Sequence, residues 1–546
     1  MNSPRQRSSD APAAPEISLG TLLWVAASAL FVLLRLAYVV NAPVGGFELI
    51  HLSGAWQASV GESDTRFVPT LFQAVTSLAL RLIASETPAR VLAFLATSTV
   101  PAAVYLLRSR LGEAGALLAL VFLALDGPAI AVGSSASALG FDTAIALWLF
   151  WALVEGPRPA WVWCVLAFAA ASAGPLVLPL AIGGVACCLL RRRYPARDVA
   201  VAGAIGATAA VALASFGFGW GWQGITAPPF VLFAASFDQA WSAATTLQLV
   251  AVYSAPWLAV GLASVATAAY RVYRTRSAAT ETVLLLTWAL LATGWAVTSL
   301  NSHNPVALAG LTLPLALISG PMVASACVAV WKADWRIARF LVPAALFAFL
   351  LAFAFLMDWA RLGKSRDINE QLLVAGFVIL GISCLGYVAS VRVALPALFV
   401  PAGVVLFVPM LAGAFGTAFG STLEQLPAPV SPRQTRDLRD IALATAESSG
   451  GRIVVHPSLV NDITWGFRDS GTLVVASRVP ETAAVVLWPV AMPRPDGYSP
   501  LAGDWLARQI PPTVAVEPLD YLRWFMHRNS GTARPVRMAV YVKDAE

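Results

Sequence analysis

The chain has 546 residues, of which 58% are hydrophobic and only 12% are charged, and its formal net charge is +6. Water-soluble domains carry about 25% charged residues and disordered chains combine low hydrophobicity with high charge, so both classes are excluded. Such a composition is typical of helices that have lipid as their solvent. Much of the positive charge lies in short loops between apolar runs, which favours a role in membrane orientation over nucleic-acid binding.

Apolar runs long enough to cross a bilayer, about 20 residues each, recur between residues 19 and 420. The polar residues 1–18 come first, and no small-residue cleavage site follows the first run, so we expect it to be retained as a helix. The run 69–84 is shorter, opens with Pro69 and contains Gln73 and Arg81, which favours an interfacial helix. The sequence thus predicts about 13 transmembrane helices, at 20–40, 88–107, 112–131, 141–155, 159–173, 174–190, 198–216, 246–270, 280–299, 305–330, 337–357, 371–391 and 395–418.

The basic residues predict how these spans are oriented. With the N-terminus inside and the run 69–84 not counted as a span, the basic clusters fall in cytoplasmic loops, as the positive-inside tendency requires. The loop 358–370 fits less well, because it lies outside with three basic and three acidic residues. We therefore predict a multi-pass protein of the plasma (inner) membrane, with a cytoplasmic N-terminus and with residues 41–68, 132–141, 216–245 and 301–304 on the outer face.

The chain changes character after residue 421. Three prolines between 427 and 432 form a stiff connector, and Ser431-Pro432 fits the cap and first position of a helix that runs to about Glu447. Strand-like runs follow at 452–456, 471–476, 483–490 and 537–543. The predicted fold class is an α-helical polytopic membrane protein in three parts: a cytoplasmic segment 1–18, a transmembrane domain 19–420 with interfacial helices at 47–60 and 69–84, and a small extracytoplasmic α/β domain 421–546.

Two acidic residues next to the predicted membrane surface are candidates for chemistry, since polar groups there are costly and tend to be functional. Glu48 and His51 are three positions apart in the predicted helix 47–60 and so share a face. A carboxylate at this boundary can accept a proton from an attacking hydroxyl, although a solvated loop carboxylate is the alternative. Asp142 follows the Ser-rich segment 134–137 and opens the next span, where it could also serve only as a helix cap.

Further polar residues lie in the same predicted outer loops. Asp64 and Arg66 precede Pro69, and an arginine at this boundary could bind a lipid phosphate or simply anchor the chain among headgroups. His303 could face the same space or merely belong to a polar loop. The sequence contains no P-loop, HExxH, GxSxG or CxxC motif.

The order of these features resembles the GT-C superfamily of membrane glycosyltransferases. In that family a first span is followed by an acidic outer loop, an interfacial helix, a Pro-Leu-type helix and a Gly/Ala-rich run with an arginine, and the matching segments here are 48–61, 69–82 and 89–112. Gly127-Pro128, the serines of 134–137 and Asp142 match the family's next three features. The likeness covers residues 20–190 and is closest to protein O-mannosyltransferases and the lipid A aminoarabinose transferase.

Three departures, one of them the absence at Ala171–Pro175 of the Lys or similar polar residue often seen in the family's fifth-span region, and one addition qualify this resemblance. The family often has an Asp-Glu pair in the first loop, where this chain has Phe47-Glu48, and the family's basic residue before the Pro-Leu helix is replaced by Phe67-Val68. In the C-terminal part, the segment 465–469 (Trp-Gly-Phe-Arg-Asp) is similar to the Trp-Tyr-Leu-Arg-Asp element of a flippase-associated prokaryotic subgroup.

The resemblance implies a mechanism. A polyprenyl-phosphate-linked sugar would be the donor, a lipid, glycan or protein the acceptor, and no nucleic acid is involved. Glu48 would take the proton of the acceptor hydroxyl with inversion at the sugar, and Asp142 would orient a substrate or, with Glu48, hold a divalent metal ion. Arg66, with His51 or His303, would neutralise the departing phosphate.

Two other functions remain open from the sequence. The apolar bundle alone would suit a transporter or flippase-like protein. A non-catalytic scaffold of the same fold, acting in glycan assembly or export, would fit the missing aspartate of the first-loop pair.

Overall fold

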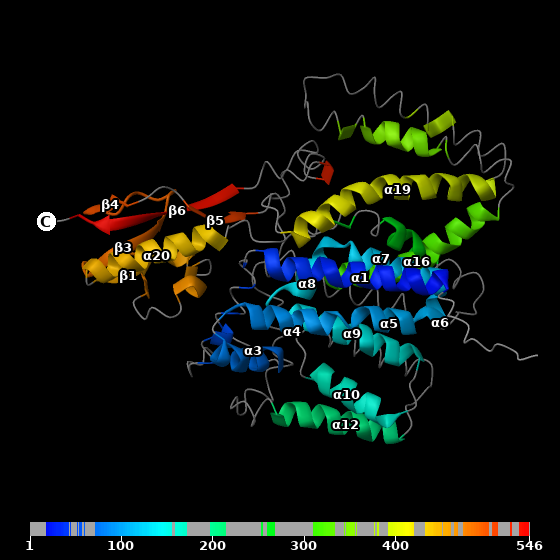
Figure 1. The fold of residues 1–546 in the computed structure, drawn as a ribbon, viewed down its shortest axis with the longest axis horizontal. Coiled ribbons are helices and arrows are strands. Elements are labelled where there is room, and N and C mark those ends of the chain that lie inside the picture. Colours follow the sequence, from blue (N-terminus) through cyan, green and yellow to red (C-terminus); the bar gives the residue numbers. More distant parts are fainter. Residues whose placement is uncertain are drawn as a thin grey trace, which may run out of the picture.

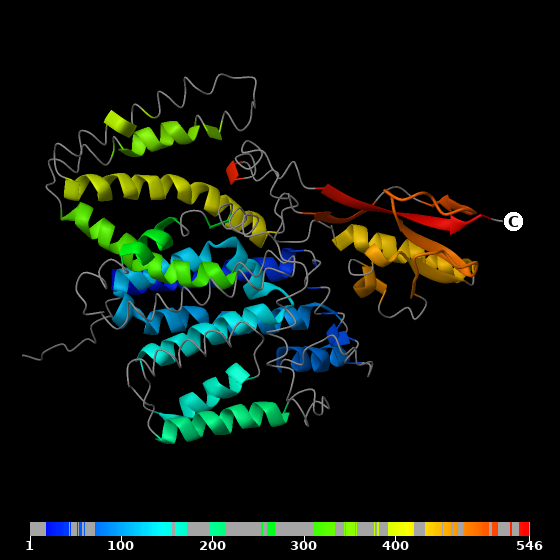
Figure 2. The same ribbon diagram turned by 180° about the vertical axis from the view of Figure 1, so that it is seen from behind.

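The computed structural model shows a bundle of roughly aligned helices with a small sheet at one end (Figure 1). The same arrangement seen from behind places the sheet beyond the ends of the helices (Figure 2). The structure describes residues within the ranges 18–59, 71–83, 85–155, 159–171, 197–213, 253–267, 309–332, 343–357, 376–381, 391–419, 432–467, 473–510, 525–526 and 534–544, with gaps inside several of them.

The bundle is built from helices that follow the predicted apolar runs. This confirms the mostly helical architecture. Its elements are α1 (Leu19–Asn41), α3 (Leu71–Leu82), α4 (Thr87–Thr97), α5 (Val100–Leu106), α6 (Arg108–Leu111), α7 (Glu113–Ala124), α8 (Gly127–Ser134), α9 (Ala138–Glu155), α10 (Ala160–Ala171), α12 (Arg197–Ala212), α16 (Ala309–Trp331) and α19 (Val391–Ala418).

Helix α1 shows why these helices need a lipid environment. Ser18 caps it by accepting a hydrogen bond from the Thr21 N–H at 3.2 Å. One face, which includes Phe31 and Tyr38, is buried against the bundle, while large apolar side chains on the opposite face are exposed, among them Val25 at 61% and Leu33 at 61%. A stripe of exposed leucine and valine is stable only against hydrocarbon.

Within the described residues, three helical stretches are long and apolar enough to cross a membrane: Leu19–Asn41, Thr87–Leu106 and Thr312–Ala329. A bent pair, Glu113–Leu125 with Gly127–Ser134, makes up to four. These helices confirm a membrane protein. The number of 13 spans, the domain boundaries and the orientation stay predictions, and the predicted spans 174–190 and 280–299 lie outside the described residues.

The predicted span 112–131 is wrong as a single helix. It is broken at Asp126 into α7 and α8, which are bent by 72°. The reason is local, because Asp126 is extended and its Oδ2 accepts a hydrogen bond from the Ala129 N–H at 3.0 Å, which starts a new helix. Pro128 lies in the first turn of α8, where its missing N–H is tolerated, and it cannot continue α7.

Glycines let α7 and α16 approach closely. A Cβ added at Gly320 would overlap the carbonyl oxygen of Gly115, and one added at Gly115 would lie 2.9 Å from the Pro321 Cα. Small residues at such crossings allow backbone-to-backbone packing in membranes.

We expect Gly320→Ala to lower the free energy of unfolding by about 1–3 kcal/mol, because the helices must separate to admit the methyl group. The matched control is Gly403→Ala in α19, where an added Cβ meets nothing within 4 Å. Unfolding in mixed detergent micelles measures both variants. Equal stability of the two would contradict the close approach of α7 and α16.

The C-terminal part contains one helix and a mixed sheet. Helix α20 (Pro432–Ser449) precedes β1 (Arg452–Val455), β2 (Leu473–Val475), β3 (Ala483–Pro489), β4 (Tyr498–Pro500), β5 (Trp505–Ile510) and β6 (Arg534–Lys543). The sheet order is β2-β1-β3-β6-β4, with β5 also paired to β6, and β1 is parallel to both β2 and β3. α20 and four strands coincide with predicted segments, while the short strands β4 and β5 were not predicted. That this part is extracytoplasmic stays a prediction.

The sheet has a defined direction relative to the bundle. Strand β6 runs away from the bundle and ends near the C-terminus (Figure 1). Because β3 is antiparallel to β6 and parallel to β1, the carboxyl ends of β1 and β3 point toward the bundle. Helix α20 packs on one face of the sheet through Leu438 and Ala442, which lie in one buried cluster with Ile453 and Val485.

Candidate active site

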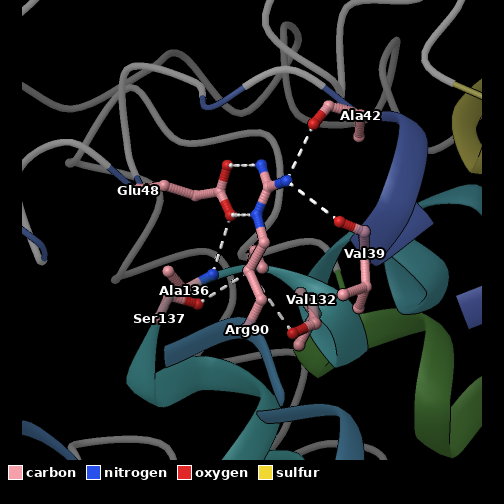
Figure 3. Close-up of polar contacts among 8 residues, drawn as sticks. Val39, Ala42, Glu48, Arg90, Val132, Ala136 and Ser137 are labelled. Carbon is pink, nitrogen blue, oxygen red and sulfur yellow. Dashed lines mark hydrogen bonds and ion pairs between the residues drawn. The ribbon is translucent and has the colours of Figure 1, made fainter. Parts of the chain in front are cut away.

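Glu48 and Arg90 form a buried ion pair (Figure 3). Glu48 Oε1 accepts a hydrogen bond from Arg90 Nε at 2.9 Å, and Oε2 accepts one from Arg90 Nη2 at 2.8 Å. Both side chains are withdrawn from the surface, since Glu48 is 0% exposed and Arg90 is 3% exposed. Two parallel charge-assisted bonds fix the plane of the carboxylate as well as its position.

Three other segments hold this pair in place. Arg90 Nη1 donates to the carbonyl oxygens of Ala42 at 2.8 Å and Val39 at 3.3 Å, which closes the C-terminal end of α1. The Ala136 N–H donates to Glu48 Oε1 at 2.7 Å from the connection between α8 and α9 (Figure 3). The site therefore joins the end of α1, the start of α4, the segment that carries Glu48 and the α8–α9 connection.

The serine-rich segment 134–137 makes the Ala136 N–H available. Helix α8 ends at Ser134, and Ser135 is already extended, so the next N–H groups leave the helix. The Ser137 N–H donates to the Ser135 carbonyl at 2.7 Å, and the two hydroxyls lie 3.0 Å apart, which tightens the connection around Ala136. Such local serine contacts compete with helix continuation and favour a turn.

Two buried hydroxyl groups lie on elements that form the site, Tyr38 in α1 and Ser134 at the end of α8. The centre of the Tyr38 ring is 5.7 Å from the Arg90 guanidinium carbon, and the Tyr38 side chain is 0% exposed. Among the described residues, neither the Tyr38 hydroxyl nor the Ser134 hydroxyl has a hydrogen-bond partner. A buried polar group without a partner is costly, so these two hydroxyls mark a place where a polar ligand would be stabilised.

Asp142 is fully buried near the start of α9, the helix that begins directly after the Ala136 connection. Its neighbour Phe141 contacts Phe72 of α3, with ring centres 6.3 Å apart, which fixes this end of α9 against α3. Both predicted acids are therefore buried on elements that meet around the α8–α9 connection. The other predicted site residues, His51, Asp64, Arg66 and His303, lie outside the described residues.

While it is paired with Arg90, Glu48 is poorly suited to bind a metal ion. Both oxygens of Glu48 accept hydrogen bonds from Arg90, whose positive charge would repel a cation at the same carboxylate. Among the described residues, no group of three or more His, Cys, Asp or Glu side chains is placed to hold a metal ion. A metal ion held by Glu48 and Asp142, as the resemblance implies, would require Arg90 to move away from the carboxylate.

Arg90 was not among the predicted site residues, although a signal for it exists. Charged residues inside apolar runs are rare and almost always face the interior of a bundle. Arg90 lies within the predicted span 88–107, and Arg35 lies within the first span, and both are buried. The two arginines could therefore have been singled out by position, but their partners could not.

A second buried polar cluster is centred on Asp126. Its Oδ2 accepts a hydrogen bond from Thr312 Oγ1 at 2.8 Å, and its Oδ1 accepts one from the Ser254 hydroxyl. The Arg35 guanidinium interacts electrostatically with Asp126 and donates to the carbonyl oxygens of Leu123 and Ala129, each at 3.2 Å. This cluster holds α1, the α7–α8 break and α16 together, and so fixes the helix that leads to Ala136.

No family model matches the sequence, and no curated protein matches it significantly. Among the solved structures that match, two cover nearly the whole chain. The structure of ArnT from Cupriavidus metallidurans bound to undecaprenyl phosphate superposes with a TM-score of 0.54 and 13% sequence identity, covering 96% of this chain and 98% of that one. The apo structure of the same protein gives a TM-score of 0.53 at 13% identity, covering 95% and 97% of the two chains. The chain therefore has the fold of ArnT, and the GT-C fold expected from the sequence is confirmed.

Proposed function

We propose that this protein is a membrane glycosyltransferase that moves a sugar from a polyprenyl-phosphate donor to an acceptor on the outer face of the membrane, with inversion. The observation that carries the proposal is the buried Glu48–Arg90 pair, in a fold shared with a protein crystallised with undecaprenyl phosphate. The unpartnered hydroxyls of Tyr38, whose ring lies next to Arg90, and of Ser134, at the end of α8, support it. A donor headgroup rich in oxygen atoms would satisfy those hydroxyls.

In the proposed reaction, Glu48 accepts the proton of the acceptor hydroxyl as the acceptor oxygen bonds to the anomeric carbon. The bond from that carbon to the phosphate oxygen breaks on the opposite side, so the configuration inverts and the lipid phosphate leaves as an anion. The contacts of Glu48 with Arg90 and the Ala136 N–H hold the carboxylate in one orientation, which a general base needs in order to reach the proton it accepts.

Asp142 orients the acceptor or the donor in this scheme, because it is buried on the helix that follows the Ala136 connection. The departing phosphate needs positive charge as the bond breaks. Arg90 is balanced by Glu48, so we propose Arg66, with His51 or His303, as the residues that supply this charge.

The test is transfer of the sugar from a polyprenyl-phosphate donor by full-length protein in lipid nanodiscs. Glu48→Gln keeps the size of the side chain but removes its basicity, and we expect kcat to fall by about 10²–10⁴-fold, the usual contribution of a general base. We expect Asp142→Asn to reduce transfer to a smaller extent. The control is Asp440→Asn on α20, which removes a carboxylate that is 70% exposed.

Two results would contradict the proposal. Unchanged transfer by Glu48→Gln would remove Glu48 as the base. Wild-type protein that binds undecaprenyl phosphate but transfers no sugar from any polyprenyl-phosphate donor would favour the non-catalytic scaffold.

A further inference from the structure

Trp465 connects the C-terminal part to the candidate active site. It lies in the short helix η6 (Thr464–Phe467), in the connection from β1 to β2, and it is 6% exposed. It shares one buried cluster with residues of the membrane part, and among the described residues it is the one member of that cluster from beyond residue 136. The other fully buried members are Leu52, Ala55, Leu80, Ala89 and Ala136.

The members of this cluster are direct neighbours of the polar site. Leu52 follows Glu48 by four positions, and both residues are helical and fully buried. Ala89 immediately precedes Arg90 in α4. Ala136 supplies the N–H that binds Glu48. Three of the segments that hold the Glu48–Arg90 pair therefore also contribute to the cluster that contains Trp465, and α3 adds Leu80 to it.

The C-terminal sheet holds η6 firmly. Phe467 and Ile463, on either side of Trp465, are buried in the cluster between α20 and the sheet, together with Leu459. Because the carboxyl ends of β1 and β3 point toward the bundle, the β1–β2 connection starts at the bundle end of the sheet (Figure 1), before it returns to begin β2 parallel to β1. One short helix thus places Phe467 in the core of the sheet and Trp465 in the cluster that the site segments share.

We propose that Trp465 is a positioning residue of the active site, through which the C-terminal sheet keeps water from the Glu48–Arg90 pair and holds the Ala136 N–H against Glu48. This deepens the proposed function, since the site is then complete only with the C-terminal part docked. Excluding water strengthens both the ion pair and the hydrogen bond, because the effective dielectric constant falls. Truncating Trp465 would let the α8–α9 connection separate from Glu48 without altering any polar side chain.

The experiment measures amide hydrogen exchange of the full-length protein in lipid nanodiscs, which does not depend on any enzymatic activity. We expect Trp465→Ala to speed exchange in peptides that cover the Ala136 connection and residues 48–56 by roughly tenfold or more, as loss of a buried aromatic side chain favours local opening. Trp465→Phe should restore much of the protection. The matched control is Trp488→Ala, which removes an 8% exposed tryptophan from a different buried cluster of the sheet.

The outcomes separate this inference from the proposed function. Unchanged exchange at Ala136 in Trp465→Ala would overturn the inference, as would Trp488→Ala opening the site to the same extent. If Trp465→Ala also speeds hydrogen exchange in the sheet, Trp465→Phe decides the question. Any increase in exchange that remains in this variant must be confined to the site peptides to support positioning. Where wild-type protein transfers sugar, kcat of Trp465→Ala should fall about tenfold or more while KM for the donor changes little, since the alignment of the base is lost and not donor binding.

Discussion

Arg90→Ala is expected to destabilise the protein by about 3–5 kcal/mol, because it leaves the Glu48 carboxylate buried without its counter-charge. The same change removes the donors that close the end of α1 at Ala42, so the segments around the site lose their common partner. Transfer from a polyprenyl-phosphate donor should fall below detection. Unfolding in mixed detergent micelles and a transfer assay in nanodiscs measure the two effects.

A double substitution distinguishes stability from activity at this pair. Glu48→Met with Arg90→Met replaces both charges by apolar groups of similar length, and this should recover most of the stability lost in Arg90→Ala without recovering transfer. The control Arg110→Ala breaks a partly exposed pair with Glu155, at 3.0 Å, and should cost only about 0–1 kcal/mol. An Arg90→Ala variant as stable as Arg110→Ala would refute the buried ion pair.

Asp126→Ala is expected to cost about 3 kcal/mol or more, since it removes the cap of α8 and leaves the buried Ser254 and Thr312 hydroxyls without their acceptor. It also removes the negative charge next to Arg35. Because α8 leads directly to Ala136, the site should become misaligned, and transfer should fall with stability. Thermal unfolding in detergent and the transfer assay report the two losses.

Asp126→Asn provides the matched comparison. The amide oxygen can still cap α8 and accept a hydrogen bond from one hydroxyl, so we expect Asp126→Asn to lose less stability than Asp126→Ala. The stability that Asp126→Asn still loses relative to the wild type then reports mainly the charge opposite Arg35. If both variants unfold within about 1 kcal/mol of the wild type, the α7–α8 break is held by the Gly127-Pro128 sequence alone.

The lengths of the apolar runs and the helix-capping residues predict much of the fold. The apolar runs predict α1, α9, α10, α12 and α16 nearly to their ends, because a stretch of side chains that needs hydrocarbon has a length set by the bilayer. Ser431-Pro432 predicts the start of α20 for an equally local reason, the preference of proline for the first helical turn. The break at Asp126 does not show in hydropathy, which averages over a window, although Asp126 before Gly127-Pro128 is compatible with a kink; one carboxylate and one proline redirect the backbone there.

The contacts of the site could not be predicted in the same way. Glu48 was singled out by its place next to the membrane, but its partners Arg90 and Ala136 lie 42 and 88 positions away. Asp126 meets Thr312 across 186 positions. No periodicity or spacing in the sequence encodes such pairs, because they depend on how α4, α8 and α16 pack together. Trp465 is a similar case. The sequence marks its segment by a resemblance to the Trp-Tyr-Leu-Arg-Asp element, but not by its packing against residues such as Leu52 and Ala136.

The burial of Arg35 has a consequence for how the protein is made. Its guanidinium donates to the carbonyl oxygens of Leu123 and Ala129, which lie 88 and 94 positions later in the chain. At a synthesis rate of about 5–20 residues per second, α1 would leave the ribosome on the order of 5–20 s before those acceptors exist. During that interval Arg35 has the Phe31 carbonyl oxygen and ring of its own helix beside it but lacks these later acceptors. Because lipid disfavours a cation, we expect the first segment to stay beside the insertion machinery until α7 and α8 have been made.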